Sequence, residues 1–181
     1  MIAGYSYSGP CAAWAYGAID PSKVSRVFVL GPSHHAYLEG CAVTSHASYA
    51  TPIGDIAIDR TVTDALLASR QFETMSVSID ADEHSIEMQL PYIAKVMHGR
   101  VFTLVPVLVG ALSAAKEALY ASLLQPYFAD PANLFVISSD FCHWGKRFRY
   151  QPIDPAHGAI HKSIEALDKQ VLDRIESTEL Y

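Results

Sequence analysis

The chain has 181 residues, half of them hydrophobic, and a formal net charge of -6 at pH 7. This length suits one domain with a substantial core, and the acidic balance argues against nucleic-acid binding. No apolar run approaches the ~20 residues of a membrane span, and we expect a soluble protein of the cytoplasm, with the nucleus as a second location.

The first part of the chain predicts a helix and then a buried strand. Residues 4–10 are rich in turn formers, and small residues with Trp14 predict a helix over residues 11–19. The apolar run at residues 27–30 has no polar alternation, which is typical of a strand covered on both faces. It stops at Gly31 and Pro32 and is followed by His34 and His35. Short strands are predicted at residues 41–44 and 56–58.

The middle of the chain predicts two helices with a weak alternation between them. A helical stripe runs over residues 61–70, and residues 76–79 alternate weakly. Acidic residues precede an apolar helical pattern that begins near Ser85, and Pro91 predicts a kink or a break in it. Glu83, His84 and Glu87 therefore lie at a helix start.

The last part predicts two further strands and two helices. Residues 102–110 give the strongest strand signal, with Pro106 at a bulge or an unpaired position. Ser113 caps a helix that reaches about Leu124, and a second apolar run occupies residues 134–137. A final helix is predicted from Asp154 to about Ile175. Strands that alternate with helices indicate one α/β domain over residues 1–181, a three-layer αβα sandwich with a largely parallel or mixed central sheet.

Polar residues follow both apolar runs. If these runs are parallel neighbours, the side chains after them meet at the carboxyl edge of the sheet, where ligands bind in open α/β folds. Two histidines and one carboxylate suit non-haem iron(II) and leave positions open for oxygen and substrate. The candidate ligands and acid–base groups are His34, His35, Glu83, His84, Asp140 and His143. The alternative is that these histidines are ordinary hydrogen-bonded residues at strand ends.

Two other chemistries have weaker support. Cys142 beside His143, and Ser33 beside His34, point in opposite directions on an extended segment, so neither pair makes an activated nucleophile without a bend. Cys142 is better explained as a core residue, and three cysteines without CxxC spacing favour reduced thiols. The basic residues at 146–149 are better explained as a solvated loop than as a phosphate clamp.

Four ordered motifs resemble the Memo family, named for a mediator of cell motility. They are LGPSHH at residues 30–35, DEHSIEMQLPY at residues 82–92, VPVLVG at residues 105–110 and SSDFCHWG at residues 138–145. The resemblance implies the fold of class III extradiol (LigB-type) dioxygenases, with His34 as a metal ligand and Asp140 and His143 lining the pocket. His143 would stand where a dioxygenase keeps its acid–base group, and the Glu83–His84 pair is another pocket motif.

The sequence departs from the family at both ends. The family motif Pro-His-Ala-Gly-Tyr, which supplies one metal histidine, is reduced here to Ala3-Gly4-Tyr5, and the family's cysteine ligand belongs to a C-terminal region beyond residue 181. We therefore expect a chain truncated at both ends, which binds iron(II) or copper weakly or not at all unless His35, Asp140 or His143 replaces the missing ligands. The shortened fold also predicts exposed apolar surface and association into oligomers.

The function implied by this resemblance is cell signalling and motility together with iron or copper redox homeostasis, without established catalysis. The first alternative is an active non-haem iron(II) oxidoreductase or dioxygenase that uses His143, Asp140 and His84. The second is an interaction module for a signalling protein or phosphotyrosine peptide, bound by Lys146, Arg147 and Arg149.

Overall fold

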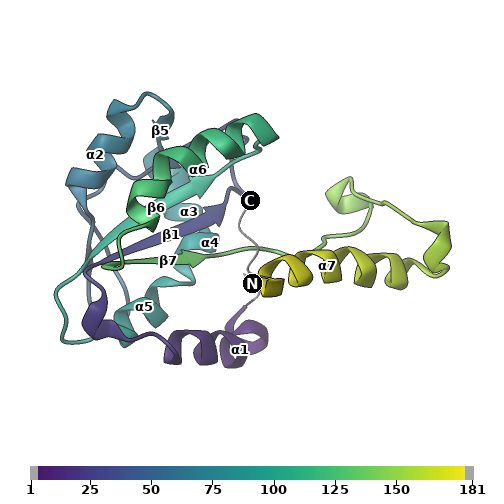
Figure 1. Ribbon diagram of the computed structural model, residues 1–181, viewed down its shortest axis with the longest axis horizontal. Helices are drawn as coiled ribbons and strands as arrows, with labels where there is room; N and C mark the ends of the chain where they lie inside the picture. Colours follow the sequence, from purple (N-terminus) through teal and green to yellow (C-terminus); the bar gives the residue numbers. More distant parts are fainter. Residues whose placement is uncertain (1–3, 178–181) are drawn as a thin grey trace. The chain divides into compact units, whose positions relative to one another are not determined.

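The computed structural model describes residues 4–177, and the chain divides into two compact units, Met1–Ser139 and Asp140–Tyr181. Figure 1 shows the helices and strands of both units. The prediction of one domain over the whole chain stays a prediction.

The first unit is built on a five-stranded sheet in the order β5-β2-β6-β1-β7. All neighbouring strands are parallel except β2 and β6, which are antiparallel. The predicted α/β class with a mixed, mostly parallel sheet is therefore confirmed. The strands are β1 (Arg26–Pro32), β2 (Cys41–Val43), β5 (Phe72–Thr74), β6 (Thr103–Val109) and β7 (Asn133–Ile137).

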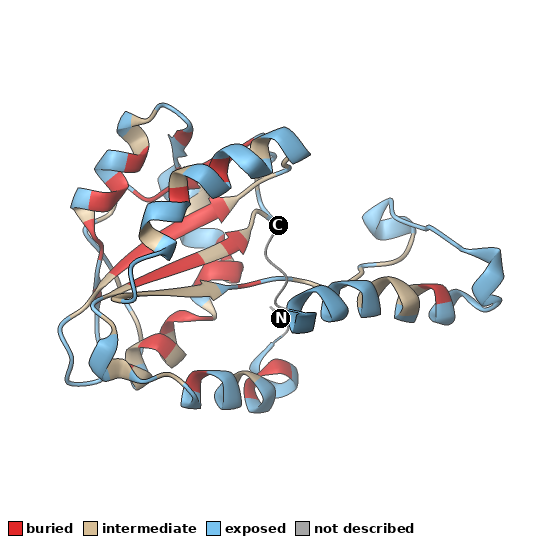
Figure 2. Ribbon diagram, in the orientation of Figure 1, coloured by how far each residue is buried: buried red, intermediate tan, exposed pale blue. Residues whose placement is uncertain are grey.

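The two apolar runs that precede the polar motifs are adjacent strands, as predicted. Strand β1 pairs in parallel with β7 from Arg26 opposite Asn133 to Leu30 opposite Ile137. Val27, Phe28 and Val29 are fully buried, since helices cover both faces of β1. Figure 2 shows β1 and β6 mostly buried, whereas β7 at the sheet edge is of intermediate exposure.

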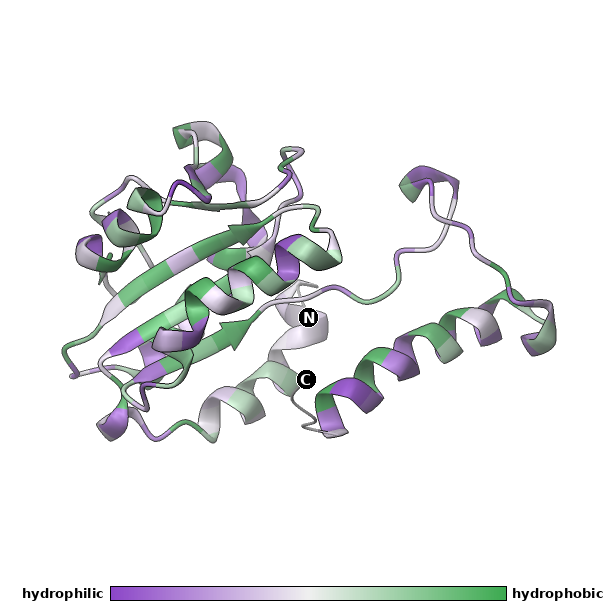
Figure 3. Ribbon diagram, turned by 45° about the horizontal axis from the view of Figure 1, so that its top comes forward, coloured by the Kyte–Doolittle hydropathy of each residue, from purple (hydrophilic) through white to green (hydrophobic). Residues whose placement is uncertain are grey.

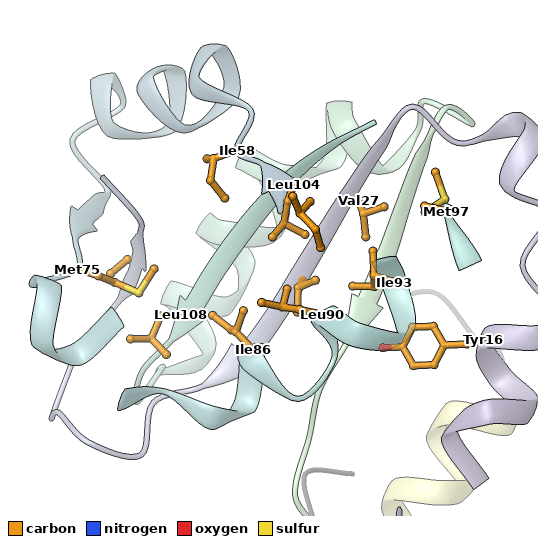
Figure 4. Close-up of a cluster of buried hydrophobic side chains, with 13 residues drawn as sticks. Tyr16, Val27, Ile58, Met75, Ile86, Leu90, Ile93, Met97, Leu104 and Leu108 are labelled. Carbon is orange, nitrogen blue, oxygen red and sulfur yellow. The ribbon is translucent and has the colours of Figure 1, made fainter. Parts of the chain in front are cut away.

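Helices cover the two faces of the sheet and make a three-layer unit. One face of β1 and β6 packs against Tyr16, Ile86, Leu90 and Ile93, the cluster drawn in Figure 4. These side chains come from α1 (Tyr5–Gly17), α4 (His84–Glu87) and α5 (Leu90–Val96). The opposite face packs against α2 (Arg60–Ala68) and α6 (Ala114–Phe128), whose N-cap is Ser113 as predicted.

Some helix boundaries differ from the predictions. The opening residues are helical, because α1 begins at Tyr5 and contains Pro10. The weak alternation at residues 76–79 belongs to α3 (Val77–Asp82), where the Ser76 hydroxyl accepts a hydrogen bond from the Ile79 amide and caps the helix. The predicted helix break is present, but it lies at Met88 and Gln89, and Pro91 stands in the first turn of α5.

Pro106 is accommodated within β6 without a bulge, because the register with β1 is continuous through Val29 opposite Pro106. On its other side β6 pairs with β2 only from Val107 to Val109, and it bridges Ile58 at Leu104. Pro106 thus occupies an unpaired position between these two contacts, which is where a strand tolerates a residue without an amide proton.

Asp59 ties three elements together at one end of the sheet. Its carboxylate accepts hydrogen bonds from Arg26 Nε of β1 at 2.7 Å, from the Thr103 hydroxyl of β6 at 2.9 Å and from the Val62 amide of α2 at 3.0 Å. Burial raises the pKa of Asp59, but these three bonds outweigh it and hold the pKa below its usual value. The ionised carboxylate therefore joins two strands to a helix start.

Short elements complete the first unit. A two-stranded antiparallel sheet, β3 (Ser48–Tyr49) and β4 (Ile56–Ala57), includes the strand predicted at residues 56–58. A 3-10 helix, η1 (Pro21–Lys23), comes after α1 and is capped by Asp20.

The second unit contains η2 (Lys146–Phe148), η3 (Pro155–His157) and α7 (Ile160–Ser177). Asp154 caps η3, but the predicted single helix from Asp154 to about Ile175 is wrong, because Gly158 has φ 74° and separates η3 from α7. Hydrophobic and polar residues alternate along α7 (Figure 3). Within residues 4–177, no helix is both long enough and apolar enough to cross a bilayer.

Candidate metal site

The loop after β1 presents the first histidine of the site. The Ser33 amide donates to the Val109 carbonyl at 2.8 Å, and the Ser33 hydroxyl donates to the Ala36 carbonyl at 2.7 Å. Ser33 is thereby used to shape the loop rather than to act as a nucleophile beside His34. The His34 side chain is 26% exposed, so solvent reaches it at the carboxyl edge of the sheet.

Glu83 is the buried centre of the site. It precedes α4, and its Oε1 accepts a hydrogen bond from the Ser85 amide at 2.9 Å. Its Oε2 accepts from the His34 amide at 2.8 Å, and Oε1 lies 2.9 Å from His34 Nδ1. Burial raises the pKa of Glu83, but the amides of His34 and Ser85 and the His34 ring lower it more, so the pKa lies below its usual value. Glu83 is therefore an ionised carboxylate.

Close packing of α4 on β1 brings Glu83 and His84 to His34. A Cβ atom at Gly31 would lie 2.5 Å from Ser85 Oγ and 3.2 Å from Ile86 Cγ1. Only glycine allows this approach without displacement of the helix. The sequence Gly31-Pro32 thus does more than end a strand, because it leaves room for the helix that carries two site residues.

Three side chains form a group that is able to hold a metal ion. The ligand atoms of His34, Glu83 and His84 all lie within 4.8 Å of one another. The ring centroids of His34 and His84 are 4.4 Å apart, and those of His35 and His84 are 5.9 Å apart. Imidazole nitrogen and carboxylate oxygen are donors that suit iron(II), and copper(II) binds such nitrogen-rich sites more tightly still.

A cavity of about 350 Å³ borders Glu83. Polar groups in its wall include His46, Tyr49, Asp80 and Glu87. Asp80 accepts hydrogen bonds from the Thr44 hydroxyl at 2.5 Å and from the Tyr49 hydroxyl. Burial, followed by the bond to Asp80, raises the pKa of Tyr49, which keeps its proton in the neutral range. The cavity is large enough for a small ligand.

His46, Tyr49 and Asp80 were not predicted as site residues. Asp80 resembles an ordinary acid at a helix start, and His46 and Tyr49 lie in a segment without a recognisable motif. The cluster of acids at residues 80–83 was the one available signal.

The other predicted residues lie in the second unit. His143 Nε2 is 3.4 Å from Asp140 Oδ2, so these two side chains are neighbours. The convergence of Asp140 and His143 with His34 and His35 stays a prediction, because the two pairs belong to different units of the chain. The Cys142 amide donates to Asp168, and burial followed by the Asp168 charge raises the pKa of the Cys142 thiol, which disfavours a nucleophilic thiolate.

The basic cluster also lies in the second unit. Lys146 and Arg147 are part of η2, and the Arg147 guanidinium carbon lies 5.8 Å from the centre of the Phe148 ring. This contact is a cation–π arrangement within the cluster. Peptide binding by these residues stays a prediction.

Comparisons with known proteins agree with the motifs. The profile of the Memo-like protein family matches residues 2–180. Protein MEMO1 of Homo sapiens is 54% identical over 176 residues, which cover 96% of this chain and 59% of that protein. Protein MEMO1 of Danio rerio is 55% identical over 96% of this chain and 59% of its own length. The memo-1 homolog of Caenorhabditis elegans is 49% identical over 97% of this chain and 50% of its own length. The chain thus spans 50–59% of the length of these relatives.

Proposed function

The chain belongs to the Memo-like protein family, and from this premise we propose that its His34, Glu83 and His84 group binds a divalent metal ion. Iron(II) is the first candidate and copper the second. The protein would act in cell signalling and motility and in metal redox homeostasis, as the family resemblance implies. The observation that carries the metal proposal is the approach of three suitable ligand atoms to within 4.8 Å of one another.

The residues fit such an ion by charge and accessibility. Glu83 supplies one negative charge at a buried position, and the side chains of His34 and His84 are 26% and 41% exposed. An ion can therefore enter from solvent while the carboxylate lowers the cost of its charge. When bound, iron or copper would supply Lewis-acid and one-electron redox chemistry.

A second candidate function is a non-haem iron(II) oxidoreductase or dioxygenase. Two observations favour it: the donor set of two histidines and one carboxylate, and the 350 Å³ cavity that borders Glu83. In this case Tyr49 and Asp80 would orient a small ligand in the cavity. His143 would be the acid–base group, as the family resemblance implies.

An anaerobic titration with iron(II) tests the metal proposal. We expect one ion per chain in the wild type and loss of that ion in His34→Ala and His84→Ala. The exposed His98 lies outside the group and provides the matched control, so His98→Ala should bind like the wild type. Equal binding by the wild type and both site variants would refute the proposal.

Oxygen uptake separates the two functions. Sustained consumption of oxygen with a catechol, abolished by His143→Ala, would establish the enzyme and overturn the non-catalytic role. Iron binding without sustained uptake would support metal handling instead. General acid–base assistance contributes roughly 10² to 10⁴ in rate, so its loss is measurable.

A further inference from the structure

The cavity that borders Glu83 has a wall of mixed chemistry. Its volume of about 350 Å³ lies in the range of small-molecule sites. The wall contains the carboxyl groups of Asp80, Glu83 and Glu87. It also contains Ile86 and Leu90, two buried side chains that are labelled in Figure 4. A ligand that fills this space therefore meets both carboxyl groups and hydrocarbon.

The negative charge of this wall has no fixed positive partner. The wall has three carboxyl groups and no lysine or arginine, so its formal charge is -3 when the histidine is neutral. The side chains of Asp80 and Glu83 are only 4% and 1% exposed, and within residues 4–177 the ion pairs described for them are with histidines. Buried charge is costly unless a positive group or a metal ion accompanies it. The cavity therefore favours a positively charged occupant.

The arginine beside the cavity is used elsewhere. Arg60 donates to the Thr44 carbonyl at 3.2 Å and to the Asp64 carboxylate at 2.6 Å. Asp80 instead accepts hydrogen bonds from the hydroxyl groups of Thr44 and Tyr49. These neutral donors hold the Asp80 carboxyl group in place without cancelling its charge. A carboxylate has about four acceptor sites, so Asp80 has the capacity to accept a further bond from a ligand.

We propose that this cavity binds a small organic cation, with an ammonium group on a short apolar body. The ammonium group donates hydrogen bonds to Asp80 and Glu87, and the apolar body packs against Ile86 and Leu90. The same carboxyl groups repel an anion of equal size, which makes the cavity selective for charge. This inference rests on the second candidate function for the use of the cavity and adds the charge class of its ligand. It does not require a bound metal ion.

Three probes that share one phenyl body test the charge selectivity. They are 2-phenylethylamine as the cation, 2-phenylethanol as the neutral compound and 3-phenylpropanoate as the anion. Each is titrated into the metal-free chain at about pH 8, where an ordinary imidazole is neutral, and binding is followed by amide NMR. At millimolar concentration the amine should shift the amides of Ala81 and Glu87 and bind roughly tenfold more tightly than the alcohol. Added salt should weaken only the binding of the amine. Equal affinities for the three probes, or no shift with the amine, would overturn the proposal.

Variants of the carboxyl groups locate the binding. Asp80→Asn should weaken binding of the amine roughly tenfold, and Glu87→Gln roughly threefold because Glu87 is exposed. Glu73→Gln is the matched control, since the exposed Glu73 lies outside the cavity wall and its loss changes the formal charge equally. Glu87→Gln keeps the test decisive even if Asp80→Asn fails to fold. Wild-type affinity for the amine in Glu87→Gln would refute the proposed contact.

The iron(II) titration separates this inference from the metal proposal. Binding of the amine without uptake of iron would refute the metal group and support the cation cavity. Uptake of iron without binding of the amine would refute the cation cavity and leave the metal group in place.

Discussion

Replacing Asp59 with alanine should destabilise the first unit by about 3.5 kcal/mol. The lost helix cap at Val62 costs about 1 kcal/mol, and the lost bond to the Thr103 hydroxyl costs a similar amount. The charged bond to Arg26 adds about 1.5 kcal/mol, at the low end of its usual range because the Arg26 side chain is 27% exposed. Asp59→Asn keeps the helix cap and a neutral side-chain hydrogen bond, so its loss in free energy of unfolding should be only about half of that in Asp59→Ala.

Urea unfolding followed by far-UV circular dichroism measures these differences. The pKa of Asp59 is below its usual value in the folded chain, so the stability it contributes is complete above about pH 4 and is lost as the pH falls through the folded value. The wild type and Asp59→Asn should therefore converge in stability as the pH falls below that range. A loss below about 1 kcal/mol in Asp59→Ala, or a gap from Asp59→Asn that widens in acid, would refute the reasoning.

Two further predictions concern the backbone and the thiols. Gly110→Ala should lower the free energy of unfolding by at least about 2 kcal/mol, because the new Cβ would lie 2.0 Å from the Leu38 carbonyl oxygen. Gly17→Ala is the control, because a Cβ there has no atom within 4 Å. Thermal unfolding of both variants measures the difference. A thiol reagent should modify the exposed Cys11 rapidly in the native chain and Cys41 only after unfolding, because burial raises the pKa of Cys41 to about 12. Equal rates for the two thiols, each measured with the other replaced by serine, would contradict this.

The sheet was predictable because its strongest signals are local. The run at residues 27–30 has no polar alternation, and a strand of that kind must be covered on both faces, as β1 is. A helix break before Pro91 was also predictable from a local signal, since proline lacks the amide proton that a continuing helix needs. Helix α3 was not predictable from the sequence, because a single serine cap outweighs a weak alternation over four residues.

The site was only partly predictable. The sequence marks His34 and the Glu83–His84 pair as candidates, but the bond between His34 and Glu83 joins residues 49 positions apart. It depends on how closely α4 docks on β1, and the one local sign of that docking is Gly31. The carboxylate faces Nδ1 of the His34 ring, and no sequence pattern carries that information.

Helix α4 has only four residues, too few to persist in water without tertiary support. Its cap, Glu83, is the residue that also holds the loop of His34, so helix formation and assembly of the histidine group are a single cooperative event. Local opening of α4 would therefore disrupt the helix and the histidine group together. By thermodynamic linkage, an ion held between His34 and His84 would slow amide hydrogen exchange in α4, and a helix of one turn would then report occupancy of the site.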